Sequence, residues 1–221
     1  MKTVLMIGTA VVAIAAAGAA PANAKAGDFL LRARAILVAP NESSSGVVPA
    51  FPAEPVSVTN SFAPELDLTW FATNHIGFEV IAATTKHHID GTTGTTGSIG
   101  RLASTWVLPP TITMQYHFIP DGHVRPYVGA GINYTVFWNT KASDALINAV
   151  GPTHVGLSDS IGWAVQTGVD IDLTKTLFLN FDIKYVGIKT TGYLDTTAAG
   201  LQQVRVTLNP IVAGVGFGFR F

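Results

Sequence analysis

The chain has 221 residues, of which 12% are charged and 48% are hydrophobic, and its formal net charge is -1. The charged share is about half of the roughly 25% found in soluble domains, and the near-neutral balance excludes the basic surface that nucleic-acid binding requires. Cysteine is absent, so no disulfide framework holds the chain together.

The first 24 residues have the composition of a cleaved export signal. Lys2 is followed by an apolar stretch from Val4 to Ala20, and Ala22-Asn23-Ala24 is the small-x-small pattern that signal peptidase cuts. We therefore expect the mature chain to begin at Lys25. A retained transmembrane anchor is the alternative, but the stretch is short for a bilayer and a cleavage pattern follows it at once.

From Phe29 onwards, apolar residues recur at every second position, which is typical of strands. The expected strands lie near residues 29–37, 64–73, 77–82, 111–118, 125–136, 161–171, 179–185 and 214–221. The connections after the first, third, fifth and seventh strands are long, at about residues 40–62, 88–104, 139–157 and 190–203, and the others are short.

An even number of strands, with short turns at one end and long connections at the other, is characteristic of bacterial outer-membrane barrels. The pattern therefore predicts an all-β fold, an eight-stranded antiparallel transmembrane β-barrel of the bacterial outer membrane over residues 25–221. Both ends of that segment are expected on the periplasmic side.

Alternation alone does not say which face of each strand is outside, because a soluble barrel of the lipocalin kind alternates too. Three features favour the membrane barrel: an aromatic C-terminal residue, glycines on the polar face, and aromatic residues near strand ends that would form an interfacial girdle. We interpret Phe221 as a C-terminal insertion signal. The glycines are Gly129, Gly131, Gly162, Gly168, Gly214, Gly216 and Gly218, and the girdle residues are Trp70, Tyr116, Phe118 and Tyr127.

One stretch does not fit the alternation. Val204, Val206 and Leu208 are out of phase with the apolar residues that begin at Ile211, and Pro210 lies at the change. Because proline within a strand is usually found at an edge or a bulge, we predict a bulge at Pro210.

The polar faces carry five positive and five negative side chains. An eight-stranded barrel is only just wide enough to be filled by side chains, so we expect these groups to pair across the lumen and close its lower half. We expect mutual pairing here and not a ligand site. The predicted network comprises Arg32, Arg34, Arg125, Lys184 and Arg220, with Glu65, Asp67, Glu79, Asp170 and Asp182.

Two further features bear on a route for solutes. Pro109 and Pro110 remove two successive backbone donors at the start of the fourth strand, so we hypothesise a lateral opening there; an irregular strand start is the alternative. The first long connection contains Val47, Val48 and Phe51, which would give an apolar mouth unless it is an ordinary variable loop.

No catalytic pattern emerges from the remaining motifs. His87, His88 and His154 fall in predicted external loops without a pattern of metal ligands, and Gly129-Ala130-Gly131 lacks the rest of a dinucleotide fingerprint. Ser158-Asp159-Ser160 reads as a strand start. A membrane enzyme acting on lipid would need His and Ser together at one rim, which the sequence does not indicate. We expect no enzyme activity, no cofactor and no metal.

Several segments together resemble the OmpW family of outer-membrane proteins, which includes the AlkL-type alkane importers. They are AGDFLLRARAILVAPNES, ATNHIGFEVIAAT, LPPTITMQYHF, RPYVGAGINYTVFW, GWAVQTGVDI and the terminal GFRF, and they cover nearly all of the mature chain in the family's order.

The resemblance implies a narrow barrel that admits small hydrophobic molecules from outside and releases them sideways into the membrane. It also implies apolar side chains that narrow the lumen at mid-height. Ile81 fits that role, whereas Lys184 stands where a bulky apolar partner is expected. The implied partners are outer-membrane lipid, lipopolysaccharide, small hydrophobic solutes and, during insertion, the barrel assembly machinery. A structural or adhesion barrel with a closed lumen, like the membrane domain of OmpA, is the alternative function.

Overall fold

Antiparallel strands make up most of the computed structural model, which describes residues 25–221. The predicted signal peptide lies outside the described residues. Eight strands form a barrel in the order β11-β12-β15-β1-β4-β5-β8-β9, and pairing of β9 with β11 closes it. Their bounds are β1 Phe29–Ala39, β4 Ser61–Phe71, β5 Ile76–Ala83, β8 Thr111–His117, β9 Val124–Ala142, β11 Ser160–Asp172, β12 Leu177–Val186 and β15 Ile211–Arg220. The predicted eight-stranded antiparallel barrel is confirmed.

The four long connections are largely built of further strands that extend the barrel beyond the membrane. β9-β7-β6-β3 form one side of this extension, and a four-stranded sheet, β10-β13-β14-β2, forms the other. Its elements are β2 Ser43–Ser44, β3 Val56–Val58, β6 Thr85–Gly91, α1 Gly94–Ile99, β7 Arg101–Leu108, α2 Asp144–Val150, β10 Thr153–Leu157, β13 Lys189–Thr196 and β14 Gly200–Thr207. The expectation that these segments are loops is therefore wrong, because the strand alternation continues through them.

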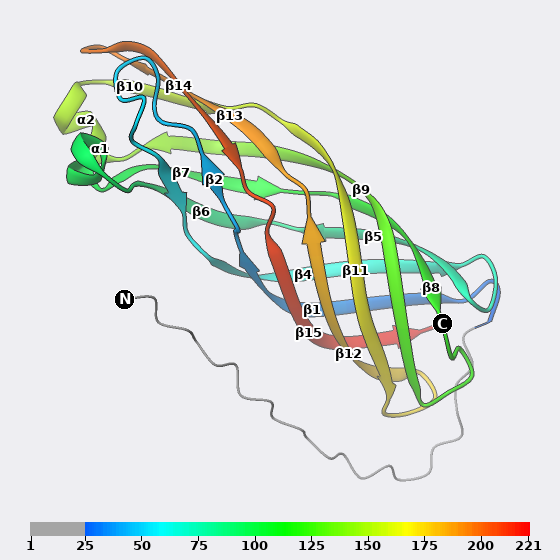
Figure 1. Cartoon of the computed structure of the whole chain (residues 1–221). Coiled ribbons are helices and arrows are strands. Elements are labelled where there is room, and N and C mark those ends of the chain that lie inside the picture. The colour runs from blue at the N-terminus through cyan, green and yellow to red at the C-terminus, as the bar shows by residue number, and fades with distance from the viewer. Residues whose placement is uncertain (1–24) are drawn as a thin grey trace.

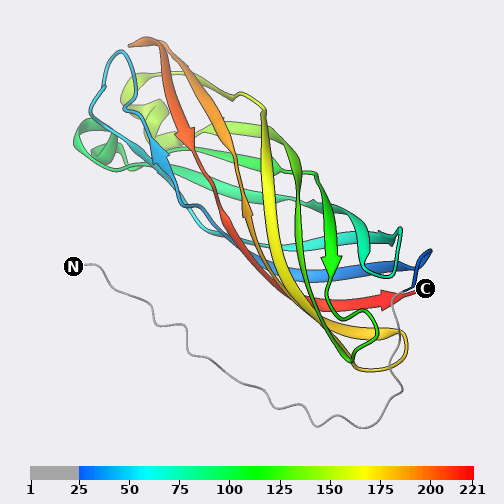
Figure 2. The same ribbon diagram turned by 45° about the vertical axis from the view of Figure 1, so that its right-hand side comes forward.

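Short turns and the C-terminus lie at one end of the elongated molecule, and α1, α2 and β10 lie at the other (Figure 1). The turned view shows the same arrangement (Figure 2). Long connections mark the extracellular end of an outer-membrane barrel, and by that rule the C-terminus lies on the periplasmic side. None of the described helices is both long enough and apolar enough to cross a membrane.

Large apolar side chains cover the outside of the barrel. Along β1 the residues alternate between exposed and buried, and the outward Phe217 and Phe219 of β15 are each 53% exposed. The inward positions of the same strands carry buried charges such as Arg32 and Asp67. A soluble barrel would show the reverse distribution, so this surface faces lipid.

Aromatic residues near the periplasmic turns follow the predicted girdle, with one exception. Trp70, Tyr116 and Phe118 are 44%, 46% and 51% exposed. Tyr127, which we also expected in the girdle, is fully buried, and its hydroxyl donates to Asp182 at 2.9 Å. Its position in β9 has the same parity as the inward Arg125, so the side chain points into the lumen.

The predicted bulge at Pro210 is not needed to account for the alternation. Even-numbered residues are buried from Gln202 through Val212, on both sides of the irregular residues 208–210, where Asn209 has a φ of 36°. Val204, Val206 and Leu208 face the interior of the extension, whereas the apolar Ile211 faces lipid. The same even-numbered positions face inward on both sides of Pro210. The difference is that the interior is apolar in the extension and polar within the membrane barrel.

Replacement of Val215 by arginine tests the lipid-facing surface. Val215 lies in the middle of β15, paired with Ala35 and Phe181, and is 45% exposed. A charge at the bilayer midplane of a barrel costs about 2–4 kcal/mol, so we expect the free energy of unfolding from lipid vesicles to fall by that amount. Gln203→Arg, on the outward face of β14 in the extension, is the matched control and should cost little. Equal stability of both variants would contradict the assignment.

Candidate functional site

Ion pairs fill the lower half of the barrel. Arg32 on β1 lies 3.0 Å from Asp67 and 3.0 Å from Asp170, on opposite sides of the lumen. Arg34 lies 2.8 Å from Glu65 and 2.7 Å from Asp67. The antiparallel register of β1 and β4 accounts for two of these pairs, because it sets Arg32 opposite Asp67 and Arg34 opposite Glu65, and Arg34 reaches Asp67 diagonally.

Two aromatic rings and two inward glycines fit around this network. The Arg32 guanidinium lies 5.3 Å from the ring centre of Tyr127 and 5.6 Å from that of Phe178. Gly218 leaves room for Phe178, because a Cβ at Gly218 would lie 2.1 Å from that ring. Gly168 leaves room in the same way for Tyr127, whose hydroxyl oxygen would lie 2.4 Å from an added Cβ. We call the whole assembly the charged plug. It comprises Arg32, Arg34, Glu65, Asp67, Glu79, Asp170, Asp182 and Lys184.

The structure brings these eight predicted residues together but places two others differently. Arg125 and Arg220 lie nearer the periplasmic end, where both approach Asp172, with Arg220 at 4.0 Å. The predicted network lacks Asp172 because the expected strand ends at residue 171. The even-numbered parity of β11, continued by one residue, would have identified it.

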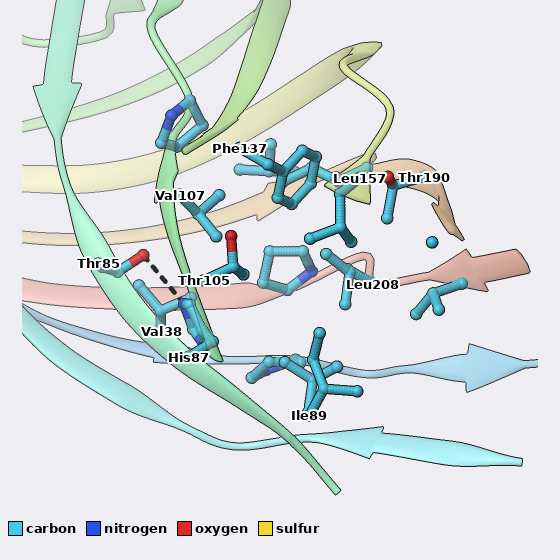
Figure 3. Close-up of a pocket in the computed structure, with 18 of the residues that line it drawn as sticks. Val38, Thr85, His87, Ile89, Thr105, Val107, Phe137, Leu157, Thr190 and Leu208 are labelled. Atoms are coloured by element: carbon cyan, nitrogen blue, oxygen red, sulfur yellow. Dashed lines mark hydrogen bonds between the residues drawn. The ribbon is translucent and has the colours of Figure 1, made fainter. Parts of the chain in front are cut away.

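Above the charged plug, the interior becomes apolar. The inward side chains of the upper barrel and of the extension line a cavity in which about 100 Å³ is open to the centre of a water molecule. Figure 3 shows them converging on one space from several strands. We call this cavity the chamber. Its apolar lining includes Ile36, Val38, Val47, Val56, Ile89, Val107, Phe137, Val155, Leu157, Val186, Leu194, Val204, Val206, Leu208 and Val212.

The floor of the chamber contains both residues predicted for the constriction. Ile81 and Lys184 are each 3% exposed, and both border the chamber together with Glu65. The Lys184 ammonium donates to Glu65 at 2.9 Å and to Asp182 at 2.5 Å. The floor is therefore part aliphatic and part ionic, because Lys184 stands where the family resemblance implies a bulky apolar residue.

Threonine and histidine side chains in the chamber wall use their donors within the wall. His87 Nδ1 lies 2.7 Å from the carbonyl oxygen of Thr59, and because a carbonyl only accepts, Nδ1 carries the ring proton and donates it. The other ring nitrogen, Nε2, then accepts from the hydroxyl of Thr85 at 2.9 Å (Figure 3). Burial lowers the pKa of His87, and the backbone carbonyl of Thr59 opposes that shift only in part. The imidazole is neutral at pH 7, as an apolar cavity requires.

The sequence interpretation placed His87 and His88 in a solvated loop, which is wrong for His87. It is 4% exposed and lies on β6, in phase with the inward Ile81 of β5. His88 points the other way and is partly exposed, and His154 is exposed on β10. Among residues 25–221 no three histidine or acidic side chains gather in a way that would hold a metal ion.

The sheet has an interrupted seam beside the prolines singled out in the sequence. Ile81 pairs with Thr111 and Thr85 pairs with Val107, so the register is the same on both sides of the interruption. Between those pairs, no ladder pair joins residues 82–84 to residues 108–110 in the described strands. Pro109 and Pro110 have no N–H to donate, and Pro109 borders the chamber. We call this interruption the proline seam.

The first long connection contributes to the chamber from above. Val47 is 4% exposed and lines the chamber, and Phe51 packs against the same apolar cluster, whereas Val48 is 41% exposed. Glu54 ties this connection to α1, because its carboxylate accepts from the backbone N–H groups of Thr95 at 2.9 Å and Thr96 at 2.7 Å, which lower its pKa.

A closed eight-stranded barrel with a lipid-facing surface, a charged plug and an apolar chamber defines the molecule as an outer-membrane β-barrel protein. The model of the OmpW family matches residues 25–221. The chain therefore belongs to the OmpW family, as its resemblance indicated, and its location is the outer membrane.

Individual relatives agree with this assignment. The chain is 36% identical over 211 residues to outer membrane protein W of Vibrio cholerae serotype O1, covering 94% of this chain and 95% of that protein. It is 32% identical over 117 residues to the dibenzothiophene metabolism operon protein PahQ of Pseudomonas aeruginosa, covering 51% and 50%. Its fold superposes on the crystal structure of the outer membrane protein OprG from Pseudomonas aeruginosa with a TM-score of 0.85 at 28% identity, covering 91% and 99%.

Arg34→Met tests the energetic role of the charged plug. The change removes one of two basic partners from each of Glu65 and Asp67 in a buried site, and breaking a buried ion pair costs about 3–5 kcal/mol. We expect the free energy of unfolding from lipid vesicles, measured by urea titration, to fall by that amount. Arg101→Met removes a half-exposed pair with Asp90 and should cost at most about 1 kcal/mol. Similar losses for both variants would show that the plug is not specially stabilising.

Proposed function

We propose that this protein is a passive channel through which small hydrophobic molecules enter the outer membrane from outside and leave sideways into the lipid. The observation that carries the proposal is the apolar chamber above the charged plug. An apolar solute that enters such a chamber leaves water, which is favourable by roughly 25 cal/mol per Å² of apolar surface buried. The side chains that it then contacts are mostly apolar as well.

The charged plug supports a lateral exit. Arg32, Arg34 and Asp67 have no exposed side-chain surface, so passage downward would require breaking buried ion pairs. An apolar solute offers no hydrogen bonds in exchange. The barrel wall is the easier route where its own hydrogen bonding is interrupted.

The proline seam is our proposed exit. It lies between β5 and β8 at the level of the chamber floor, because Ile81 and Pro109 both border the chamber. Separating residues 82–84 from residues 108–110 breaks no ladder pair, so local opening there costs less than elsewhere in the barrel.

The name of one relative is consistent with an apolar solute. PahQ belongs to an operon for dibenzothiophene metabolism, and dibenzothiophene is an apolar aromatic compound. The rival proposal, a structural or adhesion barrel, makes no use of an enclosed apolar chamber.

Uptake of a radiolabelled alkane or terpene by cells with and without the protein tests the channel proposal. We expect faster uptake with the protein, and we expect Val206→Trp to reduce the difference at least several-fold, because Val206 is 6% exposed and points into the chamber. Arg205→Trp, on the outward face of the same strand, is the matched control. Equal uptake with and without the protein would favour the structural reading.

The double variant Pro109→Thr, Pro110→Thr tests the lateral exit. Threonine at 109 restores an N–H that can face residues 82–84, whereas residue 110 faces β9, since its carbonyl accepts from the N–H of Tyr134 at 3.0 Å. The added ladder hydrogen bond closes the proline seam. We expect slower uptake with unchanged or higher barrel stability. Pro64→Thr, in a paired part of β4, should leave uptake unchanged. Normal uptake by the double variant would place the exit elsewhere.

A further inference from the structure

We propose that the chamber selects solutes with an apolar body and one neutral oxygen acceptor at the end, which the Lys184 ammonium holds at the chamber floor. This inference rests on the proposed function, in which the chamber holds the solute, and goes further by naming the chemical class. Ketones, aldehydes, esters and alcohols belong to this class and bind most tightly, whereas plain alkanes, which the channel also admits, and carboxylates bind more weakly.

Among residues 25–221, the wall of the chamber offers no free side-chain donor to such a solute. Four threonines and one histidine are the polar residues of the wall, and Thr85 and His87 use their donors on each other and on Thr59. The Thr111 hydroxyl donates to the carbonyl of Pro109 at 2.9 Å, and the Thr190 hydroxyl to that of Ser158 at 2.7 Å.

Thr105 completes the wall. Its hydroxyl lies 2.8 Å from that of Thr140, and carbonyl oxygens of Trp106 and Trp138 lie within 3.5 Å. The wall threonines therefore turn their hydroxyl hydrogens to the protein. Contact with the body of a solute is correspondingly apolar.

Lys184 is the exception. An ammonium has three N–H donors, and Lys184 uses two of them, on Glu65 and Asp182. One donor remains for a molecule in the chamber. The side chains of Lys184 and Glu65 are 4% and 3% exposed, whereas Arg32, Arg34, Asp67 and Asp182 are at 0%, so these two form the upper surface of the charged plug.

The surrounding charges decide which acceptor fits. Glu65 and Asp182 already compensate the charge of Lys184, and Arg34 is compensated by Glu65 and Asp67. A carboxylate on the solute would add a negative charge beside two carboxylates with no further cation to compensate it. An alkane would cover the remaining donor without accepting from it, which leaves a buried polar group unsatisfied. A neutral oxygen satisfies the donor and adds no charge.

Three ligands of equal length distinguish these cases. Binding of 2-decanone, decane and decanoate is measured on the full mature protein in lipid nanodiscs, with partitioning into empty nanodiscs subtracted. A hydrogen bond to a charged group makes a difference on the order of 10-fold or more, so we expect 2-decanone to bind at least about 10-fold more tightly than either of the others.

Lys184→Met removes the donor and keeps the length of the side chain. We expect the preference for 2-decanone over decane to disappear in this variant, while Lys189→Met, on the outward face of β13, retains it. A preference that survives in Lys184→Met would overturn the proposal. Far-ultraviolet circular dichroism establishes whether the variant is folded.

A second measurement needs no variant. The infrared carbonyl stretch of 2-decanone bound to the unmodified protein should lie below its value in hexane, because a hydrogen bond weakens the C=O bond. A stretch at the hexane value overturns the proposal even if Lys184→Met does not fold. Equal binding of decane and 2-decanone overturns this proposal alone and leaves the channel function standing, whereas no binding of any of the three overturns both.

Discussion

The inability of lipid to hydrogen-bond the backbone is the constraint on which this structure depends. Every strand that crosses the hydrocarbon region needs a partner on both sides, and the pairing of β9 with β11 supplies the last of them. Once the sheet is closed, each strand has one face toward lipid and one toward a narrow lumen. The apolar alternation seen in the sequence is a direct result of that division.

Closure also concentrates the polar faces of eight strands around a narrow axis, where water is excluded. Ions at these positions are stable only if they pair, and the register of β1 against β4 places Arg32 and Arg34 beside Asp67 and Glu65. Lys184 comes from β12, which is separated from β4 by β15 and β1, and reaches Glu65 across the lumen. The charged plug thus links strands that do not share a ladder, as well as closing the lower lumen.

A change of interior polarity along the barrel axis separates the plug from the chamber. Below the level of Ile81 the inward residues are mostly charged or polar, and above it they are mostly aliphatic. The outward face changes in the opposite sense, from large apolar residues to a surface that includes lysine and arginine. Outside the membrane, water surrounds the strands, and the extension folds like a soluble protein with its apolar residues inside. The proline seam lies near this change, where the barrel meets its extension.

The sequence by itself determined the features that depend on alternation and composition: the closed eight-stranded barrel, the lipid-facing phenylalanines, and most of the buried charges. It did not determine features that depend on depth along the axis or on contacts between distant strands. Parity could not say that Val204 faces inward while Ile211 faces lipid, because both are apolar and only their position relative to the membrane separates them. Tyr127 points inward because it has the same parity along β9 as Arg125, which faces the lumen. His87 lies in the chamber wall because the alternation of β5 continues into β6. Strand register and barrel closure decide which acid accepts from Lys184 and where the ladder is interrupted beside Pro109. Both exist only once the strands have paired, so the sequence could not show them.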